Sequence, residues 1–437
     1  MAAATGGRLT GPDREVDGAS IDSRNVRPGQ LFVPIVAERD GHDFIRMALD
    51  GGATAFLTDR PRPEGLQGAD DVASIEVPDT ALALADLGRA GRNRLTGPVV
   101  GVTGSVGKTS TKDLLAGVLA TTFVTAANER SFNNELGLPL TLLGAPDDTE
   151  AVVVEMGARG VGHIALLCDI ARPTVGVVTR VEGVHLELFG DLESVARAKG
   201  ELIEALPADG LAVLNADHPV VAAMAERSSA RVLRYGLSPD ADIYADAVRM
   251  DDELRASFTL HTPWGSADVN LAARGEHQVP NALAAAAAAG GIGVPVEQIA
   301  AGLSAAAISG LRMELTRTAS GILILNDAYN ANPTSMAAAL DSLAALDAGR
   351  RVAVLGVMAE LGDSAHAEHL AITARAVALG VEVIAVGTTD YGPDARHVDD
   401  VDAATALLSD LQGGDAVLVK GSRVAALERV AVALAER

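Results

Sequence analysis

The stretch Val99-Val-Gly-Val-Thr-Gly-Ser-Val-Gly-Lys-Thr-Ser110 decides the fold of the middle of this chain. It opens with a β-branched, apolar run, which predicts a buried strand over Val99–Thr103. A glycine-rich turn follows, and Thr109–Ala120 then has the apolar spacing of a helix. A strand, a glycine-rich turn and a helix in this order predict a phosphate-binding loop, because the backbone N–H groups of the turn and the helix N-terminus both favour an anion.

Two side chains of this loop indicate what its ligand is. Lys108 is placed to reach the outer phosphates of a nucleotide, and the hydroxyl of Thr109 is a suitable ligand for Mg²⁺. The general pattern has a glycine five positions before Gly107, where this chain has Val102. The alternative is a glycine-rich turn with an exposed lysine, but the strand, glycines, Lys-Thr pair and helix together favour phosphate binding.

Strands and helices alternate on both sides of the loop. Continuous apolar runs predict strands over Ala151–Glu155, Val175–Thr179, Leu211–Asn215, Gly321–Asp327, Arg351–Gly356, Val381–Val386 and Ala416–Lys420. Helical spacing predicts helices over His163–Ile170, Leu192–Leu206, Pro219–Arg227 and Asn281–Ala289, and further helices that start at Ser335, Ala365 and Ala403. A β-like stretch contains Trp264. This alternation predicts an α/β fold with mainly parallel sheets.

Length and pattern together predict three domains. A chain of 437 residues is too long for one ordinary core. We place an N-terminal domain at residues 1–96, a central domain at 97–311 and a C-terminal domain at 312–437. The segment Ile308–Glu314 is the expected hinge between the last two.

The composition excludes several classes of protein. Lys and Arg number 35 against 58 Asp and Glu, which is a net charge of −23, so the surface repels nucleic acid. The single cysteine, Cys168, excludes an internal disulfide framework and fits a reducing compartment. The longest apolar run, around Ala282–Ala289, is far too short to span a membrane. We therefore expect a cytoplasmic protein without membrane insertion.

Motifs along the whole chain resemble those of the Mur ligases, the ATP-dependent amide ligases of peptidoglycan precursor synthesis. The phosphate loop, Thr103-Gly-Ser-Val-Gly-Lys-Thr109, is similar to the shortened loop of that family. The other matches, in chain order, are Asp22-Ser-Arg24, Pro28-Gly29, Asp40-Gly-His42, Phe132-Asn-Asn-Glu-Leu-Gly137, Val154-Glu-Met-Gly157, His185-Leu-Glu187, Ala198-Lys-Gly-Glu201, Asp327-Ala-Tyr-Asn-Ala-Asn-Pro333, Leu355-Gly356, Glu360-Leu-Gly362 and Lys420-Gly-Ser-Arg423. Their shared order makes the resemblance specific.

The resemblance implies a role for each domain. The N-terminal domain is expected to bind a UDP-sugar, the central domain to be a P-loop ATPase with a mainly parallel sheet, and the C-terminal domain to be Rossmann-like. It points to the member that adds D-alanyl-D-alanine to UDP-N-acetylmuramoyl-tripeptide through an acyl phosphate, giving ADP and phosphate, and to a monomer. The alternatives are another Mur ligase, a folylpolyglutamate synthase-like ligase, or a non-catalytic P-loop nucleotide-binding protein.

The resemblance also implies a Mg²⁺ site formed by Thr109, Glu155, His185 and Lys199. In Mur ligases the matching lysine is typically carbamylated by CO₂, which turns a cation into a carboxylate-like ligand. Carbamylation needs a neutral amine, so burial would have to lower the pKa of Lys199. From the residues alone, Glu155 is equally a solvated strand-end carboxylate, His185 a loop histidine and Lys199 a lysine on a helix surface.

The remaining site residues follow from the same resemblance. Catalytic roles are implied for Lys108, Lys199, His185 and Arg312. ATP binding is implied for Thr103, Gly104, Ser105, Val106, Gly107, Lys108, Thr109, Ser110, His277, Asn281, Arg312 and Asp327. Substrate binding is implied for Ser23, Arg24, Asn133, Asn134, Tyr329, Asn330 and Asn332. Local structure offers alternatives: turn formation for Asn133 and Asn134, and helix capping for Asn281, Asp327 and Asn330.

Overall fold

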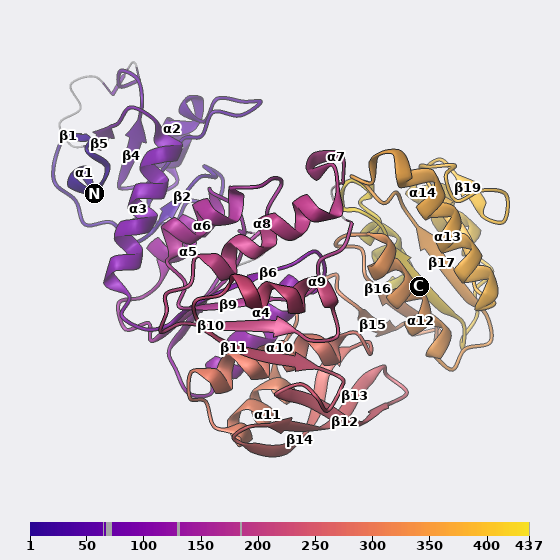
Figure 1. The fold of residues 1–437 in the computed structure, drawn as a ribbon. Helices are drawn as coiled ribbons and strands as arrows, with labels where there is room; N and C mark the ends of the chain where they lie inside the picture. Colours follow the sequence, from indigo (N-terminus) through magenta and orange to yellow (C-terminus); the bar gives the residue numbers. More distant parts are fainter. Residues whose placement is uncertain (64, 67–71, 129–131, 184–185, 437) are drawn as a thin grey trace.

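The computed structural model describes residues 1–63, 65–66, 72–128, 132–183 and 186–436. They form three α/β domains, each built around its own β-sheet (Figure 1). The sheets lie within residues 8–76, 99–274 and 314–420, so the domain boundaries that we propose, after residues 96 and 311, fall between sheets. In Figure 1 the central domain separates the other two, and the N-terminus and C-terminus lie at opposite sides of the molecule.

The N-terminal domain has a five-stranded sheet in the order β1-β5-β4-β3-β2, in which only β1 is antiparallel to its neighbour. One face of α3 packs on this sheet through Leu84 and Leu87. Its other face lies against α5 of the central domain, where a Cβ on Gly88 would be 2.8 Å from Pro139. The elements are α1 (Ala2–Thr5), β1 (Arg8–Thr10), β2 (Ala19–Ser20), β3 (Leu31–Phe32), η1 (Gly41–Phe44), α2 (Ile45–Asp50), β4 (Ala55–Thr58), β5 (Ala73–Glu76) and α3 (Thr80–Arg94).

The central domain has a nine-stranded sheet in the order β14-β13-β12-β11-β10-β9-β6-β8-β7. The strands from β7 to β12 are parallel, and β12, β13 and β14 are antiparallel. The elements are β6 (Val99–Thr103), α4 (Lys108–Leu119), β7 (Thr125–Ala127), α5 (Gly137–Gly144), β8 (Ala151–Glu155), α6 (His163–Ala171), β9 (Val175–Val178), α7 (Leu186–Phe189), α8 (Leu192–Glu204), β10 (Leu211–Asn215), α9 (Pro219–Ala222), η2 (Ala223–Arg227), β11 (Arg231–Gly236), β12 (Ile243–Met250), β13 (Arg255–Thr262), β14 (Gly265–Arg274), α10 (Gln278–Gly291) and α11 (Val296–Ala305).

Helices cover both faces of this central sheet. One core joins the sheet to α4, α10 and α11, and it includes the fully buried alanines of residues 282–289, whose small side chains let α10 pack closely. The other core joins the opposite face to α6 and α8. Because the neighbouring strands β8, β6 and β9 are parallel, the residues that follow them gather at one edge of the sheet.

Within the described ranges, every helix of the chain is too short or too polar to cross a membrane.

The C-terminal domain has a six-stranded sheet in the order β15-β16-β20-β17-β18-β19, in which only β15 is antiparallel to its neighbour. The elements are β15 (Glu314–Arg317), β16 (Leu323–Asn326), α12 (Pro333–Ala345), β17 (Arg351–Leu355), η3 (Gly362–Ser364), α13 (Ala365–Ala378), β18 (Glu382–Val386), β19 (Arg396–Val398), α14 (Val401–Leu407), β20 (Ala416–Lys420), η4 (Arg423–Ala425) and α15 (Glu428–Ala435).

Most predicted elements of the last two domains are confirmed, and β6, β8, β10 and β20 have the predicted bounds. The predicted helix Pro219–Arg227 is instead one short α-helix followed by a 3-10 helix. Helix α10 begins at Gln278, so Asn281 lies inside it and the capping alternative for Asn281 is wrong. The β-like stretch that contains Trp264 is confirmed as the antiparallel strands β13 and β14, and Trp264 lies in the turn between them.

Candidate active site

The phosphate loop runs from the end of β6 to the start of α4, and its conformation requires glycine at two positions. Gly104 and Gly107 have φ angles of 148° and 87°, which favour glycine. A Cβ on Gly107 would lie 2.4 Å from Oδ1 of Asn281, and one on Gly104 would lie 2.0 Å from Oγ1 of Thr179. The backbone can therefore turn tightly ahead of α4, whose N-terminus carries the partial positive charge that favours a phosphate.

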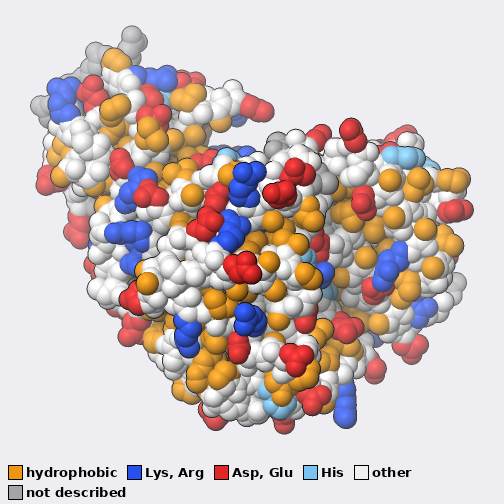
Figure 2. Space-filling view, viewed as in Figure 1, with side chains coloured by type: hydrophobic (Ala, Val, Ile, Leu, Met, Phe, Trp, Pro, Cys, Tyr) orange, Lys and Arg blue, Asp and Glu red, His pale blue; other side chains and the backbone are white. Residues whose placement is uncertain are grey.

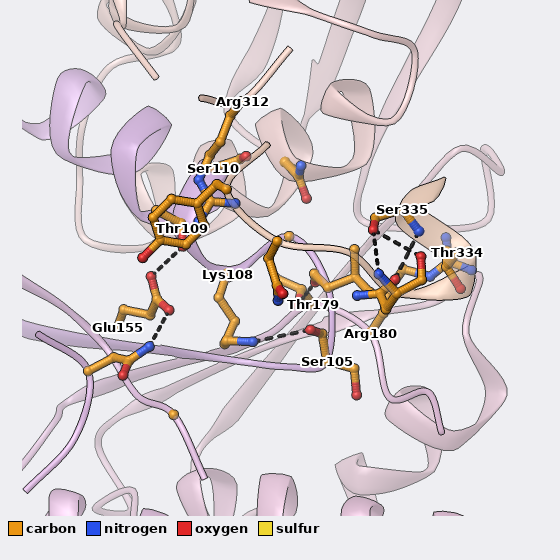
Figure 3. Close-up of a pocket in the computed structure, with 18 of the residues that line it drawn as sticks. Ser105, Lys108, Thr109, Ser110, Glu155, Thr179, Arg180, Arg312, Thr334 and Ser335 are labelled. Atoms are coloured by element: carbon orange, nitrogen blue, oxygen red, sulfur yellow. Dashed lines mark hydrogen bonds between the residues drawn. The ribbon is translucent and has the colours of Figure 1, made fainter. Parts of the chain in front are cut away.

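The first two residues of α4 lie near the carboxylate of Glu155, which ends β8 (Figure 3). Oγ1 of Thr109 donates to Oε2 of Glu155 at 2.7 Å, and Nδ2 of Asn133 donates to Oε1 at 2.8 Å. Nζ of Lys108 donates to the carbonyl oxygen of Gly104 at 2.7 Å. Burial lowers the pKa of Lys108. The ammonium of Lys108, the hydroxyl of Thr109 and the carboxylate of Glu155 thus lie together at the start of α4.

Lys199 lies on α8, and its side chain points into the protein rather than to solvent. The residue is 2% exposed, so the helix-surface alternative is wrong. Its Nζ lies 6.0 Å from the centre of the Phe189 ring. Burial and the charge of Lys108 lower the pKa of Lys199 to about 7, although Glu155 and Glu201 act in the opposite direction. Its amine is therefore neutral in a substantial fraction of molecules at pH 7.

The segment between the central and C-terminal domains brings Arg312 to the phosphate loop. Nη2 of Arg312 donates to Oγ1 of Thr109 at 2.9 Å, and the guanidinium carbon lies 4.1 Å from the centre of the Tyr329 ring. Leu311 and Met313 have φ angles of 61° and 52°, which bulky residues rarely adopt. The strained backbone on both sides of Arg312 is therefore held in place by its surroundings, with the guanidinium fixed at the start of α4.

These side chains line one cleft of about 540 Å³ between the central and C-terminal domains. Figure 2 shows the N-terminal lobe at the upper left and the C-terminal lobe at the right, with the central lobe between them. Thr103 and Gly104 do not line the cleft, Ser23 and Arg24 lie in the N-terminal domain, and His185 falls outside the described residues. The predicted site residues that do line it are Ser105, Val106, Gly107, Lys108, Thr109, Ser110, Asn133, Asn134, Glu155, Lys199, His277, Asn281, Arg312, Asp327, Tyr329, Asn330 and Asn332.

Three family models match the chain in order along its length. They are described as Mur ligase family, catalytic domain (residues 15–92), Mur ligase middle domain (102–289) and Mur ligase, glutamate ligase domain (311–423). A relative from Mycobacterium tuberculosis (strain ATCC 25618 / H37Rv), named UDP-N-acetylmuramoyl-tripeptide--D-alanyl-D-alanine ligase, is 43% identical over 480 residues, which cover 96% of this chain and 92% of the relative. The chain belongs to the Mur ligase family.

Solved structures show the same three-domain arrangement. A crystal structure of MurF from Acinetobacter baumannii is similar with a TM-score of 0.90 and 30% identity, over 100% of this chain and 98% of that one. The structure of MurF ligase from Thermotoga maritima in complex with ADP is similar with a TM-score of 0.83 and 29% identity, over 97% and 98% of the two chains. The α/β fold predicted for this Mur ligase is therefore confirmed over its length.

The asparagines of the cleft have partners that decide between the predicted alternatives. Oδ1 of Asn134 accepts from the backbone N–H of Gly137, the first residue of α5, so Asn134 does form the predicted turn. Asn133 instead uses its amide to hold Glu155. Asn332 caps α12, because its Oδ1 accepts from the backbone N–H of Ser335 at 2.9 Å and the hydroxyl of Ser335 accepts from the backbone N–H of Asn332.

Asp327 and Asn330 lie just before α12 but do not cap it, so the capping alternative for them is wrong. Asp327 forms an ion pair with Lys420, whose Nζ lies 2.5 Å from Oδ2. The same ammonium donates to the backbone oxygen of Asn330 at 2.9 Å. Burial lowers the pKa of His277. The charge of Asp327 opposes this shift, and the charge of Lys420 adds to it. Asp327, Asn330 and Lys420 therefore lie together on the C-terminal side of the cleft.

Sequence reasoning did not assign Arg159, Arg180, Thr334 or Lys420 to the site, although all four line the cleft. Arg180 follows β9 closely and Lys420 ends β20, so the rule that ligands gather at the carboxyl ends of parallel strands could have found both. Arg159 lies in a loop and Thr334 in the first turn of α12. Their places depend on how the domains pack, and no local pattern marks them.

The residues of this Mur ligase fit Mg²⁺ only together with other ligands. Among the residues that the structure describes, no group of three or more His, Cys, Asp and Glu side chains could hold a metal ion by itself. Thr109 and Glu155 supply hydroxyl and carboxylate oxygens, which are the donors that Mg²⁺ prefers. Because Mg²⁺ usually takes one or two carboxylates and completes its shell with phosphates and water, this donor set suits a nucleotide-bound Mg²⁺.

Proposed function

We propose that this chain joins D-alanyl-D-alanine to UDP-N-acetylmuramoyl-tripeptide. It is an ATP-dependent, amide-forming ligase of peptidoglycan synthesis. The observation that carries the proposal is the match to a ligase of that name over 96% of this chain and 92% of the relative. A match confined to the central domain would support ATP binding alone, whereas this one includes both outer domains. The other Mur ligases, the folate ligases and a non-catalytic protein are therefore not favoured.

The reaction needs activation because a carboxylate is a poor electrophile. A carboxylate oxygen of the tripeptide attacks the γ-phosphorus of ATP, the bond to the bridging oxygen of ADP breaks, and an acyl phosphate forms. The amine of D-alanyl-D-alanine then attacks the acyl carbon and loses a proton, and phosphate leaves with the former carboxylate oxygen. Both steps bring anionic oxygens together, so cations fixed in advance are the protein's main contribution.

The cleft provides such cations from two domains. Lys108 comes from the phosphate loop and Arg312 from the hinge, and both lie beside Thr109. We assign ATP to this loop, with Lys108 and Arg312 on its outer phosphates. The C-terminal domain places the ring of Tyr329 against the guanidinium of Arg312, so its closure onto the central domain would complete the site and exclude water from the acyl phosphate.

We assign Mg²⁺ to Thr109, Glu155, His185 and a carbamylated Lys199. A bound Mg²⁺ neutralises charge that develops on the transferred phosphate. The first two residues are supported by their hydrogen-bonded oxygens at the start of α4. His185 rests on the motif resemblance, and Lys199 on its burial and on the resemblance.

Carbamylation suits the environment of Lys199. A neutral lysine amine adds to CO₂ and releases a proton, which leaves an anionic carbamate. The pKa of about 7 makes the neutral amine available, and the product exchanges a cation that repels Lys108 for an anion that attracts it. The same burial that destabilises the ammonium therefore favours the modified side chain when a metal ion neutralises it.

We assign the other predicted residues to the substrates. The exposed guanidinium of Arg24, paired with Asp22 at 2.8 Å, suits the diphosphate of the UDP-sugar together with Ser23. The side chains proposed for the peptide ends are Asn133, Asn134, Tyr329, Asn330 and Asn332, and those proposed for the nucleotide are His277, Asn281 and Asp327.

The proposed enzyme is a cytoplasmic monomer. Cys168 is buried, and burial raises the pKa of its thiol to about 12, which keeps it unreactive. ATP and the UDP-linked substrate also belong to the cytoplasm.

A panel of acceptors tests the function. Purified protein with ATP, Mg²⁺ and UDP-N-acetylmuramoyl-tripeptide receives D-alanyl-D-alanine or single amino acids, and a parallel set receives folates with glutamate. We expect phosphate and a ligated product, measured by mass, only with D-alanyl-D-alanine. Activity only with single amino acids would indicate another Mur ligase, and activity only with folates a folylpolyglutamate synthase-like ligase. ATP binding without any product would indicate a non-catalytic protein.

Isotope transfer tests the acyl phosphate separately. The tripeptide carboxylate is labelled with ¹⁸O, and the released phosphate is analysed by mass spectrometry. One labelled oxygen per phosphate is expected, since the carboxylate oxygen leaves with the phosphoryl group. Unlabelled phosphate in an active preparation would rule out this intermediate.

A further inference from the structure

The segment 179–182, which follows β9, is tied to the phosphate loop by several hydrogen bonds. The backbone N–H of Ser105 donates to the carbonyl of Arg180 at 2.6 Å, and the hydroxyl of Thr179 donates to the carbonyl of Val106 at 2.6 Å. The hydroxyl of Ser105 donates to the carbonyl of Glu182 at 3.0 Å and accepts from its backbone N–H at 2.9 Å. Any shift of Glu182 must therefore be followed by Ser105.

The side chain of Glu182 faces the other domain. Its Oε1 forms an ion pair with Nε of Arg180 at 2.9 Å, and its Oε2 accepts from the hydroxyl of Thr334. Thr334 is the second residue of α12, a helix of 13 residues in the C-terminal domain. Figure 3 shows Arg180 beside Thr334 and Ser335. A carboxylate at this place is favoured both by the hydroxyl and by the partial positive charge of the helix N-terminus.

A continuous path of contacts thus joins α12 to the phosphate-binding lysine. It leads from Thr334 to the carboxylate of Glu182, from the backbone of Glu182 to Ser105, and from the carbonyl of Ser105 to Nζ of Lys108 at 3.1 Å. Thr334 and Glu182 lie 152 positions apart and belong to different domains. The contact exists only when these domains lie against one another.

We propose that Glu182 is a positioning residue that couples the seating of the C-terminal domain to the conformation of the phosphate loop. The side chain of Glu182 is 16% exposed, so its contacts with Arg180 and Thr334 are shielded from water and salt more than a surface pair would be. When α12 moves away, Glu182 loses the hydroxyl and the helix N-terminus, and Ser105 loses a fixed partner. The expected effect on kcat rests on the proposed function, whereas the expected effect on the conformation of the phosphate loop does not.

Variants of Thr334 test the coupling without altering the loop itself. Thr334→Val removes the hydroxyl at nearly constant volume, Thr334→Ser retains it, and Thr316→Val is the matched control on an exposed strand of the same domain. We expect Thr334→Val to lower kcat roughly tenfold, as loss of a hydrogen bond to a charged group does, with little change in KM for the UDP-substrate. Thr316→Val should keep the wild-type kcat, and Thr334→Ser, which retains the hydroxyl, should lose less kcat than Thr334→Val.

A double-mutant cycle identifies the partner. Glu182→Ala should slow the enzyme as well, and the double variant with Thr334→Val should be no slower than the slower single variant. Effects that multiply in the double variant would overturn the coupling. So would a wild-type kcat in Thr334→Val.

Hydrogen exchange tests the structural part without turnover. Amides of residues 104–108 should exchange faster in Thr334→Val than in the wild type and in Thr316→Val, although Thr334 lies in another domain. Unchanged exchange would refute the coupling. If the wild type fails to ligate the proposed substrates while exchange still responds to Thr334→Val, the proposed function fails and the coupling stands.

Discussion

Carbamylation of Lys199 predicts that activity depends on CO₂ and on the pH at which the enzyme meets CO₂. Lys199 is 2% exposed, and burial and Lys108 lower its pKa from the ordinary 10.5 to about 7. At pH 7 about half of the molecules then carry a neutral amine, against about 3 in 10⁴ for an ordinary lysine. Only the neutral amine reacts with CO₂, so the lowered pKa raises the reactive population roughly 10³-fold.

The magnitude of the pH effect follows from the same pKa. The neutral fraction of Lys199 rises from about one tenth at pH 6 to about nine tenths at pH 8. Recovery of activity becomes faster as the pH rises, because Lys199 must lose a proton before it reacts with CO₂. Enzyme freed of CO₂ and then incubated at one fixed CO₂ pressure should therefore recover activity roughly ten times faster at pH 8 than at pH 6.

The assay separates incubation from turnover. Enzyme is incubated with CO₂ at pH 6, 7 or 8, diluted into a common assay buffer and measured by initial phosphate release. ¹³CO₂ should give a carbamate signal in NMR spectra of the wild type but not of Lys199→Ala, which should bind ATP without ligating. Lys112→Met removes another buried lysine and should keep the CO₂ response. Full activity in Lys199→Ala, or recovery that is the same at pH 6 and pH 8, would refute the reasoning.

Three further substitutions probe the site and its support. Glu155→Gln removes the charge that Thr109 contacts, so titration calorimetry should show Mg²⁺·ATP affinity lowered by roughly 10–100-fold; unchanged affinity would remove Glu155 from the metal site. Gly107→Ala places a Cβ 2.4 Å from Asn281 at a φ of 87°, so nucleotide binding should weaken while the melting temperature changes less; wild-type binding would show that the loop adapts. Asn332→Ala removes the cap of α12 and should lower the free energy of unfolding by about 1 kcal/mol in urea denaturation; no loss would mean that water replaces the cap.

Local patterns predicted the strand and the helix on either side of the proposed phosphate loop. Val99–Thr103, the glycine-rich turn and the following helix are specified by neighbouring residues, and the structure shows them as β6, the loop and α4. Glu155 was found for the same reason, since a carboxylate that ends a buried strand in a parallel sheet must lie at the ligand edge.

Contacts between residues that lie far apart in the chain could not be predicted from local sequence patterns. Lys199 likewise has an ordinary helical neighbourhood in the sequence, and its burial depends on how α8 packs within the central domain. Thr334 contacts Glu182 only because two domains lie against one another, and the sequence around either residue gives no sign of this contact. The capping alternative for Asp327 and Asn330 was wrong because Asn332, which also precedes α12, has the partner three residues ahead that a cap requires.

The charge distribution explains why one cleft suits both a polyphosphate and a modified lysine. The chain carries a net charge of −23, yet Lys108, Lys199, Arg312 and Lys420 line the same cleft. Burial lowers the pKa of Lys108 and of Lys199; Arg312 lowers that of Lys108 and Lys108 that of Lys199, whereas Glu155 opposes both shifts, so an anion that enters the cleft would stabilise the two ammonium groups. ATP provides that anion from outside, and a carbamate on Lys199 would provide one from within. The charge of Lys108, which together with burial disfavours the ammonium of Lys199, is therefore also expected to attract the nucleotide that we assign to the loop.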